Sequence, residues 1–160
     1  MHFSILILTI GIPGSGKTTW VQEYVKEHPY TRVVSTDLIR KEKTGTEDSI
    51  DDPGFNNMIH EEARRKVKEI LDNPLNYGGN MGMGPVIIVD STNVDVEEWV
   101  KYKELGPSIM LAKIFEVSPE EAMKRQSGRE RQVPKRVLDD KWKSLTFTKQ
   151  FIPSFFNMIL

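Results

Sequence analysis

The chain has no cysteine among its 160 residues, so it offers no disulfide, thiolate metal site or cysteine nucleophile. A cysteine-free chain is compatible with a reducing compartment, and we expect a cytoplasmic protein. Its 22 basic and 23 acidic residues give a formal net charge of −1. A net charge this close to zero argues against a protein that coats duplex DNA by charge alone. It does not argue against a protein that binds the end of a single strand. The three histidines show no metal-ligand spacing.

Long hydrophobic runs are also missing. The apolar segment from Ile5 to Ile12 is too short to cross a membrane. It has no basic leader and continues into glycines and a lysine, which differs from a signal peptide. We therefore interpret it as a buried strand and expect no membrane partner.

Short apolar runs alternate with helical patterns along the chain. The runs predicted as strands are Phe3–Ile10, Arg32–Ser35, Val86–Val89 and Ile109–Val117. The stretches predicted as helices are Thr18–Glu27, Asn56–Asp72, Val94–Leu105, one from the capping box Ser118–Glu121 and one from Pro134. This alternation predicts an α/β fold: a mainly parallel sheet of four or five strands with helices on both faces, in one domain over residues 1–160. The glycine-rich stretch Asn76–Pro85 is expected to be a flexible connector.

The segment Gly11–Thr18 reads GIPGSGKT and fits the phosphate-loop pattern G-x-x-x-x-G-K-[ST] in full. It follows a predicted strand and opens a predicted helix, as a loop whose backbone N–H groups converge on phosphates must. We expect Lys17 to reach the β- and γ-phosphates of ATP and Thr18 to ligate Mg²⁺. The predicted nucleotide-binding set is Gly14, Ser15, Gly16, Lys17, Thr18 and Thr19. The fold is then a P-loop NTPase fold.

The kind of NTPase is indicated by the absence of a guanine-reading motif and by the length of the chain. No N-K-x-D sequence for reading guanine occurs, and the chain is short for a motor ATPase. A compact kinase fits the length best. A kinase needs a group that takes the proton of the acceptor hydroxyl, and such groups lie at the carboxyl ends of strands in a doubly wound sheet.

Two acidic residues follow predicted strands. Asp37 ends the second strand, and Arg40 lies one helical turn further on. These two could form the acceptor site, or Asp37 could only cap the next helix while Arg40 is solvated. Asp90 ends the third strand, which is the Walker B position for a magnesium ligand. The following Thr92 and Asn93 could belong to the acceptor site, or could mark an ordinary helix start.

A basic segment runs from Lys124 to Arg136 and holds one acidic residue. Its position after the fourth strand and its helix is where compact P-loop kinases carry a lid, here approximately residues 118–136. Arg125 and Arg129 are four residues apart, so we expect both to project from one helix face onto the nucleotide. Arg129 could stabilise transition-state charge. Arg131, Lys135 and Arg136 could contact nucleic-acid phosphates, although a surface role is favoured for each.

Taken together these motifs resemble the kinase domain of bacteriophage 5′-hydroxyl polynucleotide kinase and the related kinase half of animal polynucleotide kinase-phosphatases. The resemblance covers most of the chain and keeps the family's order. Its pieces are LTIGIPGSGKTTW (Leu8–Trp20), the Asp37/Arg40 pair, YGGN (Tyr77–Asn80), VIIVDSTN (Val86–Asn93) and KIFEVSPEEAMKRQSGRERQVPKRVL (Lys113–Leu138).

The resemblance implies an ATP- and Mg²⁺-dependent kinase acting on a nucleic-acid 5′ end, located in host-cell cytoplasm if phage-encoded. It makes Asp37 the general base and Arg40 a contact of the acceptor's phosphate. Asp90 would line the acceptor site or hold Arg40, in place of the Walker B role. Arg125 and Arg129 would touch ATP. The chain has Thr36 where the phage enzyme has a basic residue, and it holds no D-x-D-G-T phosphatase motif.

Two other functions stay open from the sequence. One is a small-molecule, nucleotide or modified-base kinase of the same fold, which Thr36 and the near-neutral charge favour. The other is a nucleotide-dependent switch without phosphotransfer, against which Asp37 and the lid arginines speak. The aromatic tail Phe147–Leu160 is expected to pack on its own domain, with a homo-oligomer interface as the alternative.

Overall fold

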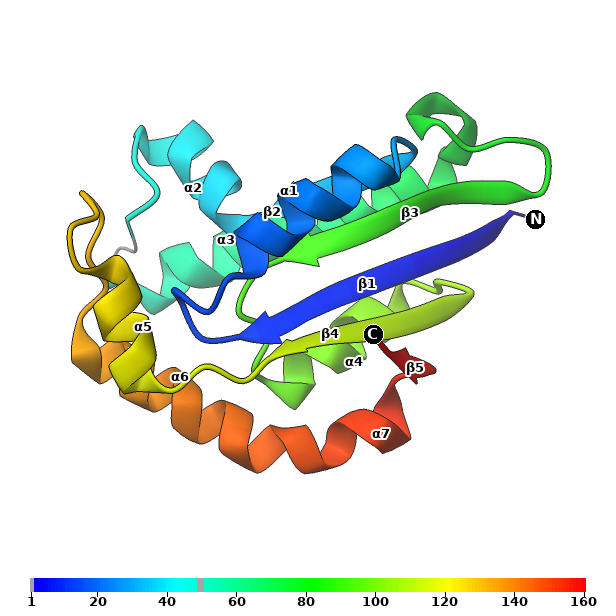
Figure 1. Cartoon of the computed structure of the whole chain (residues 1–160). Coiled ribbons are helices and arrows are strands. Elements are labelled where there is room, and N and C mark those ends of the chain that lie inside the picture. Colours follow the sequence, from blue (N-terminus) through cyan, green and yellow to red (C-terminus); the bar gives the residue numbers. More distant parts are fainter. Residues whose placement is uncertain (1, 49–50) are drawn as a thin grey trace.

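A computed structural model describes residues 2–48 and 51–160. Its centre is a five-stranded sheet in the order β2-β3-β1-β4-β5, in which every pair of neighbouring strands is parallel (Figure 1). The strands are β1 (Phe3–Gly11), β2 (Thr31–Ser35), β3 (Met83–Asp90), β4 (Ile109–Phe115) and β5 (Met158–Ile159). The predicted α/β class with a parallel sheet is confirmed.

Alternate residues of β1 face opposite sides of the sheet, and both sides are covered by helices. Ile7 packs with Val21 of α1 (Lys17–Glu27), which lies in front of the sheet in Figure 1. Leu6, Leu8 and Ile10 belong to the larger core on the other side. That core is closed by α2 (Thr36–Thr44), α3 (Pro53–Asp72), α4 (Val96–Glu104), α6 (Lys135–Thr148) and α7 (Ile152–Phe155). Burial on both faces explains why the strands are almost continuously apolar.

The remaining helix, α5 (Pro119–Gln126), packs at the end of the sheet where the strands point. Ala122 of α5 forms a small separate core with Ile12 of the phosphate loop and Leu138 of α6. The Ser118 hydroxyl accepts from the backbone N–H of Glu121 at 3.2 Å, so the predicted capping position is confirmed. This packing attaches the basic segment to the phosphate loop.

The expectation of a flexible connector over Asn76–Pro85 is wrong at both ends. A 3₁₀ turn, η1, covers Pro74–Tyr77, and β3 begins at Met83 rather than at Val86. Asn80 and Met83 exchange two backbone hydrogen bonds of 2.7 and 3.3 Å, which lead the chain into the strand. The sequence pattern did not predict this ordered structure, because hydrophobic periodicity depends on apolar side chains and the glycines have none.

Several predicted helix boundaries move. The helix predicted from Asn56 begins at Pro53, because the Asp52 carboxylate accepts from the backbone N–H groups of Gly54 and Phe55 at 2.9 and 3.2 Å. A polar side chain that sequence reading left in a loop is therefore a helix cap. The helix predicted over Val94–Leu105 is shorter, running from Val96 to Glu104.

The aromatic tail divides into a buried and an exposed part. Phe155 and Phe156 lie 5.7 and 5.2 Å from the buried Trp99 ring, centroid to centroid, so this part packs on its own domain as expected. Phe147 at the end of α6 and Phe151 in the short turn η2 (Lys149–Phe151) are exposed, and their ring centroids lie 5.7 Å apart. An oligomer interface through this exposed pair stays a prediction. In the described ranges, no helix has both the length and the apolar character needed to cross a membrane.

Replacing Phe156 with alanine should lower the free energy of unfolding by about 3–5 kcal/mol, since the ring is 5 % exposed and its loss leaves a cavity against Trp99. Phe147→Ala is the matched control and should cost under about 1 kcal/mol, because that ring is 64 % exposed. Urea unfolding followed by tryptophan fluorescence measures both. Equal losses would contradict the division of the tail.

Candidate active site

The phosphate loop joins the end of β1 to α1. Gly14 and Gly16 have φ angles of 78° and 95°, a left-handed conformation that favours glycine at both positions. Gly16 is also the N-cap of α1, so the first N–H groups of that helix are directed toward the loop. The Lys17 Nζ donates to the Ile12 carbonyl at 2.7 Å, across the loop. The arrangement of glycines, lysine and helix start predicted from the sequence is present.

The Lys17 amine is buried, and its burial lowers its pKa from 10.5 to about 8. The carboxylates of Asp90 and Asp37 act in the opposite direction, while the Arg131 guanidinium lowers the pKa further. All three groups are therefore within electrostatic reach of the amine. Residues from β1–α1, the end of β2, the end of β3 and the lid thus form one charge cluster at the carboxyl edge of the sheet.

Thr18 and Asp90 meet beside Lys17. The Thr18 hydroxyl donates to Asp90 Oδ2 at 2.9 Å. Burial raises the pKa of the Asp90 carboxyl, and the Thr18 hydrogen bond and the Lys17 charge only partly oppose that rise. A carboxylate that is costly to bury would be stabilised by a cation. The part of the chain that the structure describes gives no hydrogen bond or ion pair between Asp90 and Arg40.

This pair of oxygens fits Mg²⁺. Neighbouring ligands on an octahedral Mg²⁺ at 2.0–2.1 Å are separated by roughly 2.9 Å, and the two oxygens lie 2.9 Å apart. No group of three or more histidine, cysteine or acidic side chains suited to a metal occurs in residues 2–48 and 51–160. Mg²⁺ does not need such a cage, because it is usually held by one or two protein oxygens together with water and phosphates. Thr18 and Asp90 could hold the ion.

Asp37 lies in the first turn of α2, and both of its oxygens are paired with arginine. Arg40 Nη1 donates to Oδ1 at 2.7 Å, and Arg131 Nη1 donates to Oδ2 at 2.9 Å. The helix is capped by Ser35, whose hydroxyl accepts from the Leu38 N–H at 3.3 Å. The alternative in which Asp37 serves as the cap is therefore wrong, and so is the solvated Arg40, which is 7 % exposed.

The lid differs from the expectation of one helical face. Helix α5 ends at Gln126, and Gly128 takes a φ of 84°, so Arg129 lies beyond the helix. Arg125 stays on α5, close to the phosphate loop, since its Nη1 lies 3.7 Å from the point where a Gly16 Cβ would be. Both side chains are exposed.

The loop after α5 is closed by glutamines. The buried Gln126 donates from Nε2 to the Val133 carbonyl at 2.7 Å and accepts from the Val133 N–H at 2.9 Å. Gln132 donates to the carbonyls of Gln126 and Arg129 at 2.7 and 2.8 Å. These bonds fix the backbone that carries Arg131. The favoured surface role for Arg131 is wrong, because its guanidinium lies on Asp37.

Asn93 and Thr92 shape the site from the end of β3. The buried Asn93 donates from Nδ2 to the carbonyls of Thr9 and Val89 at 2.8 and 3.2 Å and has a φ of 45°. Its side-chain nitrogen is therefore committed to the fold, which differs from the expected substrate contact. The Thr92 carbonyl accepts from the Gly11 N–H at 3.0 Å, while its side chain is half-buried.

A cavity of about 690 Å³ opens beside this turn. It is lined by Thr92 and Asn93, by the first turns of α3, by the start of α4 and by Lys141 of α6. Burial lowers the pKa of His60 in its wall, and Arg40 is near enough to contribute to that lowering. The residues that line the cavity connect it with the end of β3 through Thr92 and Asn93, and they include neither Asp37 nor Arg40.

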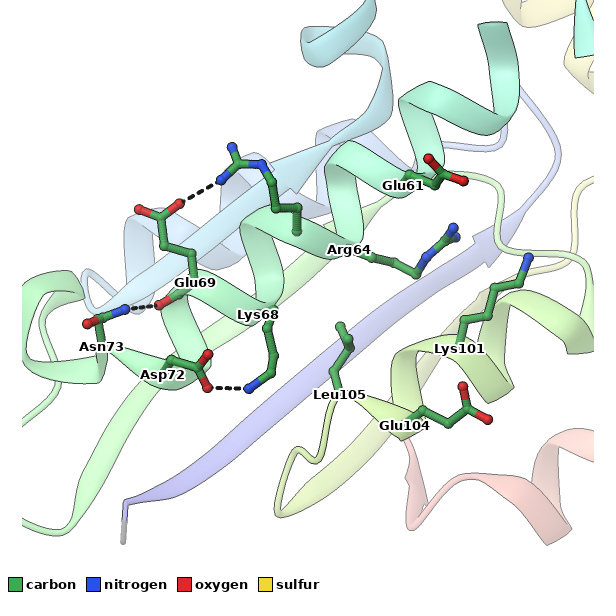
Figure 2. A pocket seen from close by; sticks show the side chains of 10 residues that line it. Glu61, Arg64, Lys68, Glu69, Asp72, Asn73, Lys101, Glu104 and Leu105 are labelled. Atoms are coloured by element: carbon green, nitrogen blue, oxygen red, sulfur yellow. Dashed lines mark hydrogen bonds and ion pairs between the residues drawn. The ribbon is translucent and has the colours of Figure 1, made fainter. Parts of the chain in front are cut away.

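A second hollow, of about 730 Å³, lies between α3 and the end of α4 and holds none of the predicted site residues (Figure 2). Its charged side chains are largely paired along α3, with Lys68 contacting Asp72 and Arg65 contacting Glu69. We assign it no part in the site.

Sequence reading missed three residues of the charge cluster. Arg131 has no helical spacing to the other lid arginines, and Glu47 and Asp48 sit in a polar loop after α2. Glu47 Oε2 lies 3.9 Å from Arg131 Nη1, and Asp48 Oδ1 lies 3.7 Å from Arg131 Nε. Thr36 is buried and donates to the Ser91 hydroxyl at 3.0 Å, so it joins the ends of β2 and β3. No sequence motif marks these contacts.

Comparison with solved structures places this geometry among known folds. A chain of the Pnkp1/Rnl/Hen1 RNA repair complex matches with a TM-score of 0.76 and 24 % identity, over 94 % of this chain and 46 % of that one. A chain of a second Pnkp1/Rnl/Hen1 complex matches with a TM-score of 0.63 and 24 % identity, over 84 % and 41 %. A gluconokinase from Sinorhizobium meliloti 1021 matches with a TM-score of 0.56 and 16 % identity, over 91 % and 77 %.

The chain spans less than half the length of the two repair-complex chains it matches, and identities of this size show the fold. A sequence model of a protein family, described as AAA domain, matches residues 6–148, which is most of the chain. With the phosphate loop, the parallel sheet and the lid in place, the chain belongs to the AAA domain family and has the fold of P-loop kinases.

Proposed function

We propose that the protein transfers the γ-phosphate of ATP to the 5′-hydroxyl of a DNA or RNA end. One observation carries this proposal: the Asp37 carboxylate, held by Arg40, follows the end of β2, where Ser35 pairs with Asp90 of β3, and Asp90 accepts from Thr18 of the phosphate loop. A nucleotide switch needs no such carboxylate, whereas a kinase needs a proton acceptor opposite its γ-phosphate.

The nucleotide half of the site is built from the loop and the lid. The N–H groups of residues 14–19 and the Lys17 ammonium would bind the β- and γ-phosphates, with Arg125 above them. Thr18 and Asp90 would hold Mg²⁺, which when bound offsets the charge of the phosphates. We favour this Walker B role of Asp90 over contact with the acceptor because its carboxylate faces Thr18.

The acceptor half is built around Asp37. Its carboxylate would take the proton of the 5′-hydroxyl as that oxygen attacks the γ-phosphorus. The bond from phosphorus to the β,γ-bridging oxygen breaks, and ADP leaves with the electron pair. Arg40 holds Asp37 in place and could contact the acceptor's 3′-side phosphate, while the cavity next to Thr92 and Asn93 would take part of the acceptor.

Two observations support a nucleic-acid acceptor. The motifs from Leu8 to Leu138 resemble those of polynucleotide kinases, and the fold matches a chain of an RNA repair complex over 94 % of its length. The lid adds Arg129, Lys135 and Arg136 as exposed cationic side chains near the site, and such groups suit a phosphate backbone. These relatives do not single out a bacteriophage form.

A small-molecule kinase is the second candidate. It is supported by the gluconokinase match, which covers 77 % of that enzyme, and by the mixed charge of the cavity next to Thr92 and Asn93. Incubation with γ-labelled ATP and a panel of 5′-hydroxyl DNA, 5′-hydroxyl RNA, nucleosides and sugar alcohols would separate the two. Label on the oligonucleotides supports the first proposal, and label only on a small alcohol supports the second. Hydrolysis with no labelled acceptor would contradict both.

Asp37→Ala and Asp37→Asn should lower phosphotransfer about 10²- to 10⁴-fold, because the proton acceptor is lost. ATP affinity should stay within a few fold, since Asp37 makes no bond to the phosphate loop in the described structure. Asp140→Asn, a change at an exposed carboxylate of α6, is the control and should leave both unchanged. Turnover that survives in Asp37→Asn would refute the base assignment.

Arg129→Ala should reduce kcat by as much as about 10³-fold, and should change ATP affinity far less, if this guanidinium meets charge that develops in transfer. Lys143→Ala, a change at an exposed cationic side chain of α6, is the control and should leave kcat unchanged. Steady-state kinetics and equilibrium nucleotide binding give the two quantities. A defect confined to affinity would assign Arg129 to ground-state binding.

ATP binding should draw in a proton above pH 8. Lys17 has a pKa of about 8 in the free protein, so the amine is largely neutral at pH 9, and bound phosphates raise its pKa again. The uptake should be roughly half a proton at pH 8, larger at pH 9 and near zero at pH 6.5. Calorimetry in buffers of different ionisation enthalpy measures it. Lys17→Arg should abolish the dependence because arginine stays charged, and uptake that persists there would have another source.

A further inference from the structure

Asp37 has one buried arginine partner and one accessible one. The Arg40 side chain is 9 % exposed and belongs to the same helix, so its bond to Oδ1 is part of the fold. The Arg131 side chain is 31 % exposed and reaches Oδ2 from the lid, 94 residues away in sequence. An ion pair with this exposure stabilises only weakly, so Oδ2 can exchange partners.

The pairing of both Asp37 oxygens with arginine competes with the chemistry proposed above. A hydroxyl must form a hydrogen bond to a carboxylate oxygen before its proton can be taken. Oδ1 is occupied by Arg40, and Oδ2 is occupied by Arg131. The acceptor therefore has to compete with Arg131 for the oxygen that it needs.

Arg131 also lies within reach of the nucleotide site. It bonds Asp37 and follows helix α5, whose Ala122 and Arg125 lie against Gly14 and Gly16 of the phosphate loop. A bound polyphosphate carries several negative charges and would attract the Arg131 guanidinium strongly. Asp37 carries one negative charge, and Glu47 and Asp48 carry one each but lie further from Arg131. Bidentate binding of phosphate suits a guanidinium better than the single bond to Oδ2 does.

We propose that Arg131 is a positioning residue that couples the two halves of the reaction. Without nucleotide it is bonded to Oδ2 of Asp37, and with ATP bound it moves to the phosphates and frees that oxygen for the acceptor hydroxyl. The proposal rests on the proposed function for the meaning of Asp37, but the movement itself needs only nucleotide. The glutamine bonds that fix the loop backbone limit this movement to the side chain.

The first test needs no acceptor. Unfolding by urea is measured for the wild type, Asp37→Asn, Arg131→Gln and the double variant, with and without a saturating non-hydrolysable ATP analogue and Mg²⁺. The four proteins form a double-mutant cycle. In the free protein, the coupling between Asp37 and Arg131 should change the unfolding equilibrium constant by about two- to fivefold, which is the upper part of the range for exposed ion pairs. With the analogue the coupling should vanish. Coupling that is absent in the free protein, or unchanged by the analogue, overturns the proposal.

The same cycle with Arg136→Gln in place of Arg131→Gln is the matched control. Arg136 is another exposed arginine near the lid, and it makes no ion pair within the described ranges. It should show no coupling to Asp37 in either state. A coupling of equal size there would mean that the signal reports general electrostatics, and the proposal would fail.

The second test uses a 5′-hydroxyl oligonucleotide. In the wild type the analogue should tighten oligonucleotide binding about two- to fivefold, and by reciprocity the oligonucleotide should tighten analogue binding equally. Arg131→Gln should bind the oligonucleotide tightly without analogue and lose the response to it, while Arg131→Lys should keep part of it. A response that persists in Arg131→Gln overturns the proposal. An oligonucleotide that does not bind refutes the nucleic-acid acceptor instead, and the unfolding cycle still decides the role of Arg131.

Discussion

The active site depends on a lysine ammonium that is buried among charges of both signs. Lys17 is held across the loop by the Ile12 carbonyl, and its burial makes the charged form costly. Two carboxylates, Asp90 and Asp37, offset part of that cost from neighbouring strands. A site balanced in this way has room for one more large negative charge, which the phosphates of a nucleotide supply. Burial also raises the pKa of the Asp90 carboxyl, and the charge of Asp37 adds to that rise.

The parallel sheet brings these groups together. Strands β1, β3 and β2 are neighbours and end at one edge, so the phosphate loop, Asp90 and Asp37 converge there, although Thr18 and Asp90 are 72 residues apart in sequence. The polar residues behind them hold the strand ends in place. Asn93 binds the carbonyls of Thr9 and Val89, and the buried Thr36 joins Ser91. These bonds fix the backbone at this edge of the sheet, so the side chains of the phosphate loop and the lid can change partners on a fixed support.

Sequence analysis predicted the parts of the site that lie at the ends of regular elements. The phosphate loop has its own spacing, and Asp37 and Asp90 follow apolar runs, so the rule for strand ends located both. It failed for Arg131, because the chain leaves α5 before that residue and helical spacing no longer applies. It placed β3 at Val86–Val89 and missed the first residues of the strand, because glycine and proline open it. It left Asn93 open between the acceptor site and a helix start, since a sequence does not reveal which amides are committed to backbone carbonyls.

The charges around the acceptor entrance bear on which acceptor fits. The cavity beside Asn93 is lined by three residues that are always basic, Arg64, Lys101 and Lys141, and by four acidic ones, Glu61, Asp95, Glu97 and Glu98. Glu98 already accepts from Arg64 at 2.7 Å and pairs with Lys101 at 3.3 Å. A cavity neutralised in this way suits a sugar or base better than a phosphate. The phosphates of a polynucleotide would then have to be held by Arg40 and the lid arginines, so the lid, more than the cavity, distinguishes a nucleic-acid end from a small alcohol.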